Sequence, residues 1–169
     1  MSDAIFLDPH HVTVGYTGVP GDRSFFLQVE DDAARVTLLL EKGQVEGIGE
    51  LMGQVLARID DQPATDWDRD AMALRPPIEP AWRVGEIGLG VDPESERVVL
   101  ELTEVVADDT VEPSTVQVSL DRDQARRLAA HAQETVTQGR PRCELCGRPM
   151  GLDGDHVCPS TNGHGALSR

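Results

Sequence analysis

The feature that most constrains the fold is a strand-to-helix junction that occurs twice in the chain. The two junctions have the sequences VTLLLEKGQV and VQVSLDRDQA. Glu41 and Gln44 in the first correspond to Asp121 and Gln124 in the second, at a fixed offset of 80 residues. An acidic residue three positions before a glutamine, at the start of an apolar stripe, resembles a capping box that closes the first turn of a helix. The recurrence therefore predicts two similar units within one chain.

Segments with the composition of strands precede each junction. They are rich in β-branched and aromatic residues and are bordered by turn-forming residues. After each junction, apolar residues recur every three or four positions, which is typical of a helix with one buried face. The sequence thus predicts an α+β fold in which two β-β-β-α repeats form antiparallel sheet with two helices. The expected strands are 11–16, 24–30, 35–40, 82–91, 97–106 and 115–120, and the expected apolar stripes are Val45, Ile48, Met52, Val55 and Ile59 in the first helix and Ala125, Leu128, Ala129, Ala132 and Val136 in the second.

A polar linker separates the repeats. Residues 61–80 hold four of the eleven prolines and five acidic residues. An Asp-x-Asp-x-Asp run within the linker resembles the start of a calcium-binding loop. Ala71 and Pro77, however, stand where such a loop needs glycine and glutamate, so a solvated loop is expected instead. We place the repeats at about residues 5–60 and 81–138, within a duplicated body of residues 1–138, and a separate tail at residues 139–169.

The charge of the chain excludes several classes of partner. The body carries 27 acidic and 11 basic residues, a net charge of −16, whereas the tail has a net charge of +1. A polyanion of this size repels nucleic acid and anionic lipid, so we expect binding to neither. No apolar run approaches the roughly 18–20 residues that cross a bilayer, and the first residues, MSDAIFLDPHH, lack the basic and apolar regions of a signal peptide. These features predict a cytoplasmic protein.

All three cysteines lie within the tail. Cys143 and Cys146 form a Cys-x-x-Cys-Gly motif, which is typical of a zinc knuckle, and Cys158 follows about a dozen residues later. A secreted disulfide scaffold uses an even number of cysteines spread through the chain. Redox Cys-x-x-Cys motifs occupy a strand-to-helix junction, whereas this motif lies in a loop-rich segment between two Arg-Pro pairs. The pattern therefore favours a metal site.

A zinc ion in a structural role takes four nitrogen or sulfur ligands in a tetrahedron. Three come from the cysteines, and His156, two residues before Cys158, is our choice for the fourth. His164 and Asp155 remain alternatives for this position. Four protein ligands leave no position for an activated water, so the predicted zinc is structural rather than catalytic.

No set of residues has the recognisable frame of a catalytic site. His10 and His11 form a pair suited to acid–base work, although a pair beside a proline turn is more often a surface feature. Arg23 and Arg83 occupy what we expect to be matching strand positions and could hold a carboxylate or phosphate. We expect a non-enzymatic module that binds a protein partner or a small molecule. The alternative is an enzyme acting on a small metabolite in a cleft between the repeats. The sequence does not determine the oligomeric state.

Four motifs in order resemble an actinobacterial family catalogued as domain of unknown function 3090. They are GDRSFFLQ from Gly21, LEKGQV from Leu40, WRVG from Trp82, and the ending that runs from Cys143 through His-Val-Cys-Pro to Asn-Gly. The resemblance covers nearly the whole chain and implies an actinobacterial cytosolic protein, but it implies no known activity. The chain departs from the family after Gly163, where His-Gly-Ala replaces the expected aromatic and basic residues.

Overall fold

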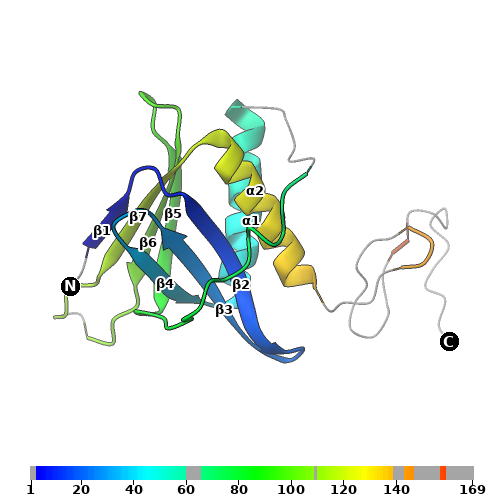
Figure 1. The fold of residues 1–169 in the computed structure, drawn as a ribbon, viewed down its shortest axis with the longest axis horizontal. Helices are drawn as coiled ribbons and strands as arrows, with labels where there is room; N and C mark the ends of the chain where they lie inside the picture. Colours follow the sequence, from blue (N-terminus) through cyan, green and yellow to red (C-terminus); the bar gives the residue numbers. More distant parts are fainter. Residues whose placement is uncertain (1–2, 60–65, 109, 139–142, 147–156, 159–169) are drawn as a thin grey trace. The chain divides into compact units, whose positions relative to one another are not determined.

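The computed structural model describes residues 3–59, 66–108, 110–138, 143–146 and 157–158 of the 169-residue chain. The chain divides into two compact units, residues 1–136 and residues 137–169. The strands and helices described here lie in the first unit, apart from the final residue of the second helix (Figure 1).

The first half of this unit forms a three-stranded antiparallel sheet, in the order β2-β3-β4, followed by helix α1. A tight turn joins β2 to β3, and Gly18 and Gly21 have positive φ angles of 95° and 90° there. A side chain at Gly18 would also collide with the carbonyl oxygen of Asp22, so this turn requires glycine. The elements are β2 (His11–Val19), β3 (Asp22–Glu30), β4 (Arg35–Leu40) and α1 (Lys42–Ile59).

The second half repeats this order and ends in helix α2. Its three antiparallel strands form a four-stranded sheet together with the N-terminal strand β1, in the order β1-β7-β6-β5. Strand β1 lies parallel to β7, with Asp3 opposite Thr115. The elements are β1 (Asp3–Phe6), β5 (Val84–Val91), β6 (Val98–Glu104), β7 (Thr115–Leu120) and α2 (Arg122–Thr137).

These elements confirm the predicted α+β fold. β4 and β7 have the expected bounds, and the other predicted strands differ by up to three residues at their ends. All five residues of the predicted stripe of α2 are buried, whereas α1 buries Leu56 and leaves Val55 and Ile59 only partly buried. Two features were not expected: the strands divide between two sheets, and β1 adds a parallel pairing.

The two halves exchange the segments that precede their first strands. Strand β1 comes before β2 but pairs with β7 of the other half. In the same way, residues 81–83 come before β5 but run parallel to β4 of the first half. There the amide of Ala81 donates to the carbonyl of Thr37 at 2.8 Å, and the amide of Leu39 donates to the carbonyl of Trp82 at 2.9 Å. Each half therefore supplies an edge segment to the sheet of the other.

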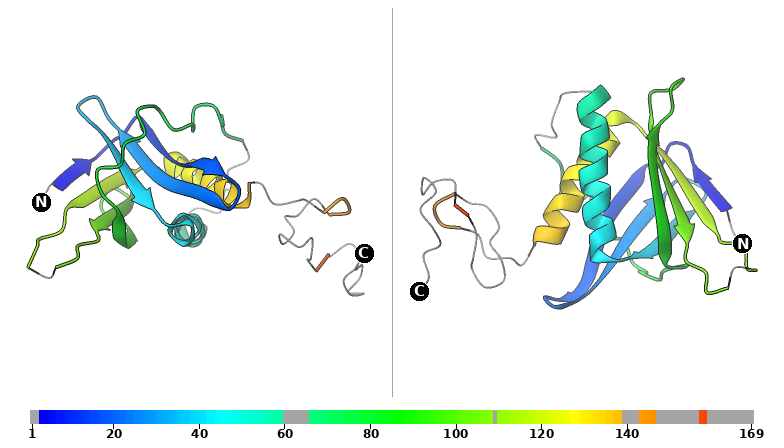
Figure 2. Two further views of the ribbon diagram at one scale, coloured as in Figure 1. Left: turned by 90° about the horizontal axis from the view of Figure 1, so that it is seen from below. Right: turned by 180° about the vertical axis from the view of Figure 1, so that it is seen from behind.

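The helices lie side by side against the sheets (Figures 1 and 2). Helix α1 contacts both β3 and β5, which belong to different sheets. The helices approach closely at Gly49, where an added Cβ would lie 3.2 Å from the carbonyl oxygen of Ala129. Apolar side chains of both sheets and both helices fill one continuous core; its fully buried members include Val14, Leu27, Leu38, Met52, Leu100, Val118 and Leu128.

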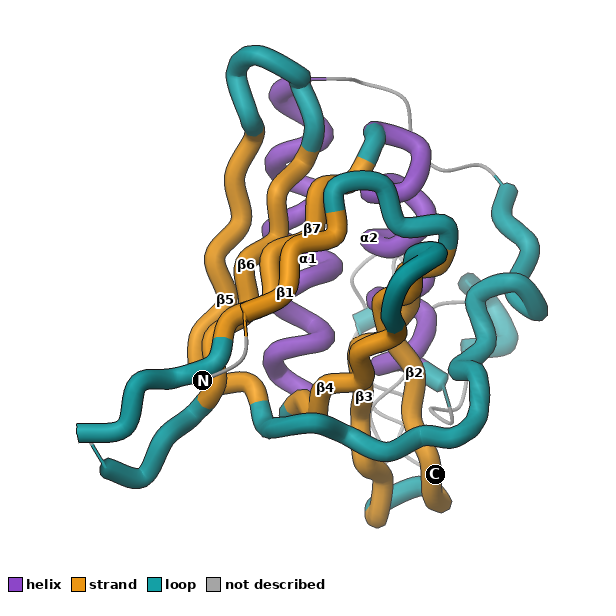
Figure 3. The backbone as a smooth tube through the Cα atoms, turned by 60° about the vertical axis from the view of Figure 1, so that its left-hand side comes forward, coloured by secondary structure: helices purple, strands orange, loops and turns teal. Residues whose placement is uncertain are grey.

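The linker crosses the outer face of the three-stranded sheet, one strand after another (Figure 3). The hydroxyl of Thr13 on β2 donates to the carbonyl of Met72. The buried Gln28 on β3 donates to the carbonyl of Arg75 at 2.9 Å and accepts from its amide at 2.8 Å. Leu74 packs over Gly15, where a Cβ atom would lie only 2.7 Å from the Leu74 side chain. The described acidic residues of the linker are therefore exposed, while the segment from Met72 to Arg75 anchors it.

None of the described helices is both long and apolar enough to span a lipid bilayer.

Candidate metal centre

The three cysteines of the second unit converge on one point. Their Sγ atoms all lie within 4.8 Å of one another, and those of Cys143 and Cys158 are 3.8 Å apart. Cys143 and Cys158 are 8% and 9% exposed, and Cys146 is half-buried. Within the described ranges, these side chains form the one group of three or more His, Cys, Asp or Glu residues that could share an ion.

Two segments of the chain supply these sulfurs. A turn at residues 144–146 directly follows Cys143. This turn brings the thiol of Cys146 back towards that of Cys143, as the two-residue spacing predicts. Cys158 arrives from a second segment, next to Val157, whose side chain is 88% exposed. The buried sulfur beside an exposed valine shows that the cysteine, rather than its apolar neighbour, is turned inward.

The sulfur spacing fits a shared metal ion. A disulfide would place two sulfurs about 2.05 Å apart, so the 3.8 Å between Cys143 and Cys158 shows separate thiols. Two thiolates at about 2.3 Å from a tetrahedral zinc ion lie about 3.8 Å from each other. Three thiolates are also the donor set that soft metal ions prefer. The cysteine group could therefore hold a metal ion without large rearrangement.

The predicted fourth ligand, His156, lies outside the described residues, as do its alternatives Asp155 and His164. The fourth position of the site therefore stays a prediction.

The two arginines proposed as ligand-binding residues do not occupy matching positions. Arg23 lies in β3, the second strand of its half, and its guanidinium stacks 4.1 Å from the ring of Tyr16. Arg83 precedes β5, the first strand of its half, and forms an exposed ion pair with Glu41 at 2.8 Å. The expected register was wrong, because Arg23 lies in the second strand of its half whereas Arg83 lies in the edge segment that precedes the first strand of the other half.

His10 and His11 differ sharply in their environments. His10 has a side chain that is 45% exposed and lies 3.8 Å from Asp32. His11 is only 5% exposed, and its Nε2 atom is buried without a hydrogen-bond partner among the described residues. Burial lowers the pKa of His11 below its usual value, and the nearby Arg75 guanidinium lowers this pKa further. His11 is therefore a neutral core residue rather than a surface residue, contrary to the expectation from the proline turn.

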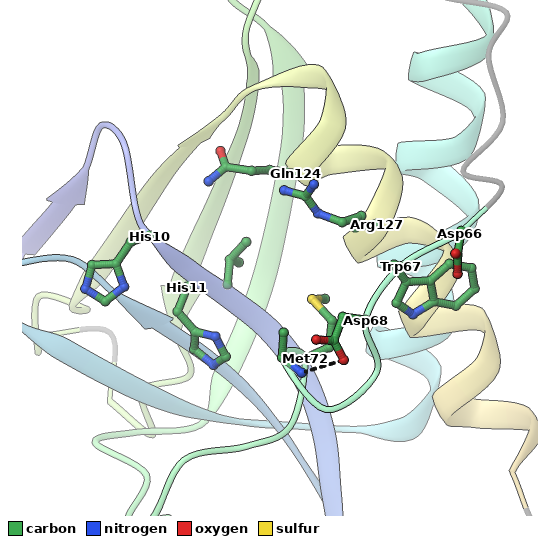
Figure 4. A pocket seen from close by; sticks show the side chains of 10 residues that line it. His10, His11, Asp66, Trp67, Asp68, Met72, Gln124 and Arg127 are labelled. Atoms are coloured by element: carbon green, nitrogen blue, oxygen red, sulfur yellow. Dashed lines mark hydrogen bonds between the residues drawn. The ribbon is translucent and has the colours of Figure 1, made fainter.

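A cavity of about 470 Å³ opens where the start of β2, the linker and α2 meet (Figure 4). His10 and His11 line it from β2, and Gln124 and Arg127 line it from α2. The linker contributes the segment from Asp66 to Met72, apart from Arg69 and Asp70. Two features noted in the sequence, the histidine pair and the acidic run of the linker, thus belong to one cavity. Arg127 carried no sequence signal, because nothing marks an exposed helical arginine as facing a cavity.

A family described as protein of unknown function (DUF3090) matches residues 5–158. The chain belongs to the DUF3090 family. The region matched to DUF3090 contains both β-β-β-α halves and all three cysteines. No curated protein and no solved structure matches the chain.

Proposed function

We propose that this DUF3090 protein is a non-enzymatic binding or protein-interaction protein with one structural zinc ion in its tail. The observation that carries the metal site is the convergence of the sulfurs of Cys143, Cys146 and Cys158 within 4.8 Å. His156 completes the proposed tetrahedron. The actinobacterial origin, the cytoplasmic location and the internal duplication belong to the same proposal, supported by the sequence motifs and by the shared order of elements in the two halves.

Zinc is the metal that best suits this donor set and this kind of segment. Zinc has no redox chemistry and accepts thiolate and imidazole ligands in a closed tetrahedral site. Apparent binding free energies of about 10 kcal/mol or more are enough to order a segment that is too short to have a core of its own. Such a site stabilises the tail and performs no reaction.

Metal analysis of the full-length protein, purified without chelators and kept reduced, tests this proposal. We expect about one zinc ion per chain by inductively coupled plasma mass spectrometry. Cys146→Ser should lower the zinc content at least tenfold, because it removes one thiolate ligand. Glu144→Gln is the matched control, since it alters an exposed residue of the same turn and should retain the metal. Protein that is folded and reduced but carries no stoichiometric zinc would contradict the proposal.

The fourth ligand requires separate variants. We expect His156→Ala to weaken zinc binding at least tenfold and to change the visible spectrum of the cobalt-substituted protein, because the metal loses a nitrogen ligand. His164→Ala and Asp155→Ala should leave both unchanged. If either of these two variants shows the loss instead, His156 is not the ligand.

The binding role of the body draws support from the cavity between β2, the linker and α2. The alternative function, an enzyme acting on a small metabolite between the halves, draws on the same cavity because it contains imidazole and carboxylate groups. The two differ in turnover. A bound molecule that is recovered unchanged after prolonged incubation with the protein supports binding, and its conversion supports the enzyme.

A further inference from the structure

Two residues that line the cavity between β2, the linker and α2 have buried polar atoms with no partner in the described part of the chain. The side chain of His11 is buried, and its Nε2 atom has no hydrogen bond there. The indole Nε1 of Trp67 is likewise buried and unpaired among the described residues. Leaving a buried polar group unpaired is unfavourable, and native proteins rarely do so. Both residues line one cavity, and buried unpaired groups of this kind point to a bound molecule or ion.

The indole is held in place for such a role. The guanidinium of Arg69 lies 4.6 Å from the centre of the Trp67 ring and covers its face. Arg69 is fixed in turn by Glu134 of α2, because its Nε donates to both carboxylate oxygens at 3.0 Å. The face of the ring is thus occupied, and the indole forms a fixed part of the cavity wall.

The cavity carries opposite charges that the described residues do not neutralise. Arg127 forms no ion pair with a described residue, and neither does Asp66. Asp68 uses Oδ1 to accept from the amides of Asp70 and Ala71, at 2.9 and 3.3 Å, and its second oxygen has no described partner. Figure 4 shows Arg127 on the side of α2 and Asp68 across from it, near Met72. A ligand with a single charge would meet a group of like charge, whereas a ligand with both charges would be matched at each end.

We propose that this cavity binds a small zwitterion with an apolar group, which is the chemistry of an α-amino acid. Arg127 receives its carboxylate, Asp66 and Asp68 receive its ammonium group, and Trp67 forms the wall beside them. Val12 and Met72 provide an apolar wall, and a volume of about 470 Å³ lies in the range of ligand pockets, about 300–1,000 Å³. This inference rests on the proposed binding role and is independent of the zinc site, which lies in the other unit.

Matched probes separate the contribution of each charge. We would titrate the full-length protein with L-phenylalanine, with phenethylamine, which lacks the carboxylate, and with 3-phenylpropanoate, which lacks the ammonium group. The same set built on leucine, with isoamylamine and 4-methylpentanoate, removes the dependence on one apolar group.

Binding is followed by ¹⁵N–¹H spectra of the indole groups. Trp67 and Trp82 are the two tryptophans of the chain, and Trp82 does not line this cavity. We expect the Trp67 signal to move, the Trp82 signal to stay, and at least one zwitterion to bind tenfold more tightly than either of its singly charged analogues.

Charge-neutralising variants test the assignment of each end. Arg127→Gln should weaken zwitterion binding about tenfold and leave phenethylamine binding unchanged. Asp66→Asn combined with Asp68→Asn should weaken the zwitterion and phenethylamine but not 3-phenylpropanoate. In this double variant, the side-chain carbonyl introduced at position 68 would still accept the two turn hydrogen bonds. Arg58→Gln and Glu50→Gln, on exposed positions of α1, are the charge-matched controls.

The proposal is overturned if neither zwitterion moves the Trp67 signal at about 10 mM, or if the singly charged analogues bind as tightly. Equal losses in the cavity variants and in the α1 controls would overturn it as well. The zinc content of the same samples is measured separately, so a failure of this inference and a failure of the metal site are distinguishable.

Discussion

The two capping residues of the repeated junction behave differently at the level of single side chains. The Asp121 carboxylate accepts from the amide of Gln124 at 2.8 Å, and Gln124 accepts from the amide of Asp121 at 3.0 Å, which makes a reciprocal capping box. The side chain of Gln44 likewise accepts from the backbone amide of Glu41 at 2.8 Å. The backbone amide of Gln44, however, donates to the backbone carbonyl of Glu41 and not to its carboxylate. The longer Glu41 side chain instead pairs with Arg83.

This difference predicts unequal costs for the same substitution. Asp121→Ala should destabilise the protein by about 1 kcal/mol, because the first turn of α2 loses its side-chain acceptor. Glu41→Ala removes only an exposed ion pair and should cost a few tenths of a kcal/mol. Urea unfolding of the two variants measures both values. Equal losses would show that Asp121 does not act as a cap.

Two buried histidines link the stability of the fold to pH. Burial lowers the pKa of His11 and of His131, so both are neutral in the folded chain. The groups that act on His11 are Arg75, Arg35, Glu30 and His10, whereas His131 hydrogen-bonds the backbone of Val14 and lies near Glu134 and Arg69. The unfolded chain therefore binds more protons than the folded chain below about pH 6.5, the ordinary pKa of histidine.

The free energy of unfolding should consequently fall as the pH is lowered from about 6.5. The fall ends once the pH is below the pKa values of the two histidines in the folded chain. The slope is at most about 1.4 kcal/mol per pH unit for each histidine. Urea unfolding between pH 7.5 and about 5 measures the slope. The double variant His11→Gln and His131→Gln should flatten it, while His10→Gln, at an exposed position, should not. A slope that is unchanged in the double variant would show that carboxylates cause it.

At the scale of elements, the linker depends on a few polar contacts rather than on secondary structure of its own. Gln28, in the middle of β3, is fully buried and makes three bonds: to both backbone groups of Arg75 and to the hydroxyl of Thr37, at 3.0 Å. Arg75 also pairs with Glu30 at 3.2 Å, and the Arg35 guanidinium beside Glu30 keeps the pKa of that carboxyl low. These contacts place the acidic run of the linker beside the cavity.

Gln28→Leu should therefore release the linker while leaving the sheet intact. The substitution leaves the amide and carbonyl of Arg75 without their partner, at a cost of about 1–3 kcal/mol. Hydrogen exchange should show faster exchange of the backbone amides of residues 68–75, with little change in β6 and β7. Thr37→Val, which removes a single bond to Gln28, is the matched control and should have a smaller effect. Equal protection of the linker in both variants would contradict its anchoring through Gln28.

At the scale of the whole molecule, the two halves of the first unit depend on each other. Gln44 donates to the carbonyl of Val84 at 3.0 Å, and Gln124 donates to the carbonyl of Pro9 at 2.6 Å, so each cap glutamine contacts the segment that starts the other half. The exchanged edge segments and the continuous core also join the two halves. We therefore expect the first unit to unfold as a single cooperative transition.

Removal of the metal should leave that transition unchanged. The first unit has its own core, and the cysteine group belongs to the second unit. A strong zinc chelator should make Cys143, Cys146 and Cys158 reactive towards a thiol reagent, while the melting temperature of the first unit changes by less than about 2 °C. Without chelator, Cys146→Ser should likewise make Cys143 and Cys158 reactive and leave the melting temperature of the first unit unchanged. A fall of the melting temperature by more than about 5 °C would show that the metal supports the core.

Local sequence patterns determined most of the secondary structure of this protein and the position of its cysteine motif. The apolar stripes that follow Glu41 and Asp121 predicted both helices, because a helix with one buried face needs that spacing wherever it packs. The alternating strands and the Cys-x-x-Cys turn were predictable for the same reason, since they depend on neighbouring residues. The family was also recognisable from four short motifs.

What only the tertiary structure decided depends on residues that are far apart in the chain. β1 is four residues long and has no pattern of its own, and its pairing with β7 joins positions 112 residues apart. The burial of His11 beside a proline turn follows from the linker that covers its sheet. The cavity combines one histidine pair, one acidic run and one helical arginine, none of which indicates the others. Sequence periodicity shows which face of an element is buried. The element that packs against this face depends on the tertiary arrangement of distant segments, and no local pattern contains that information.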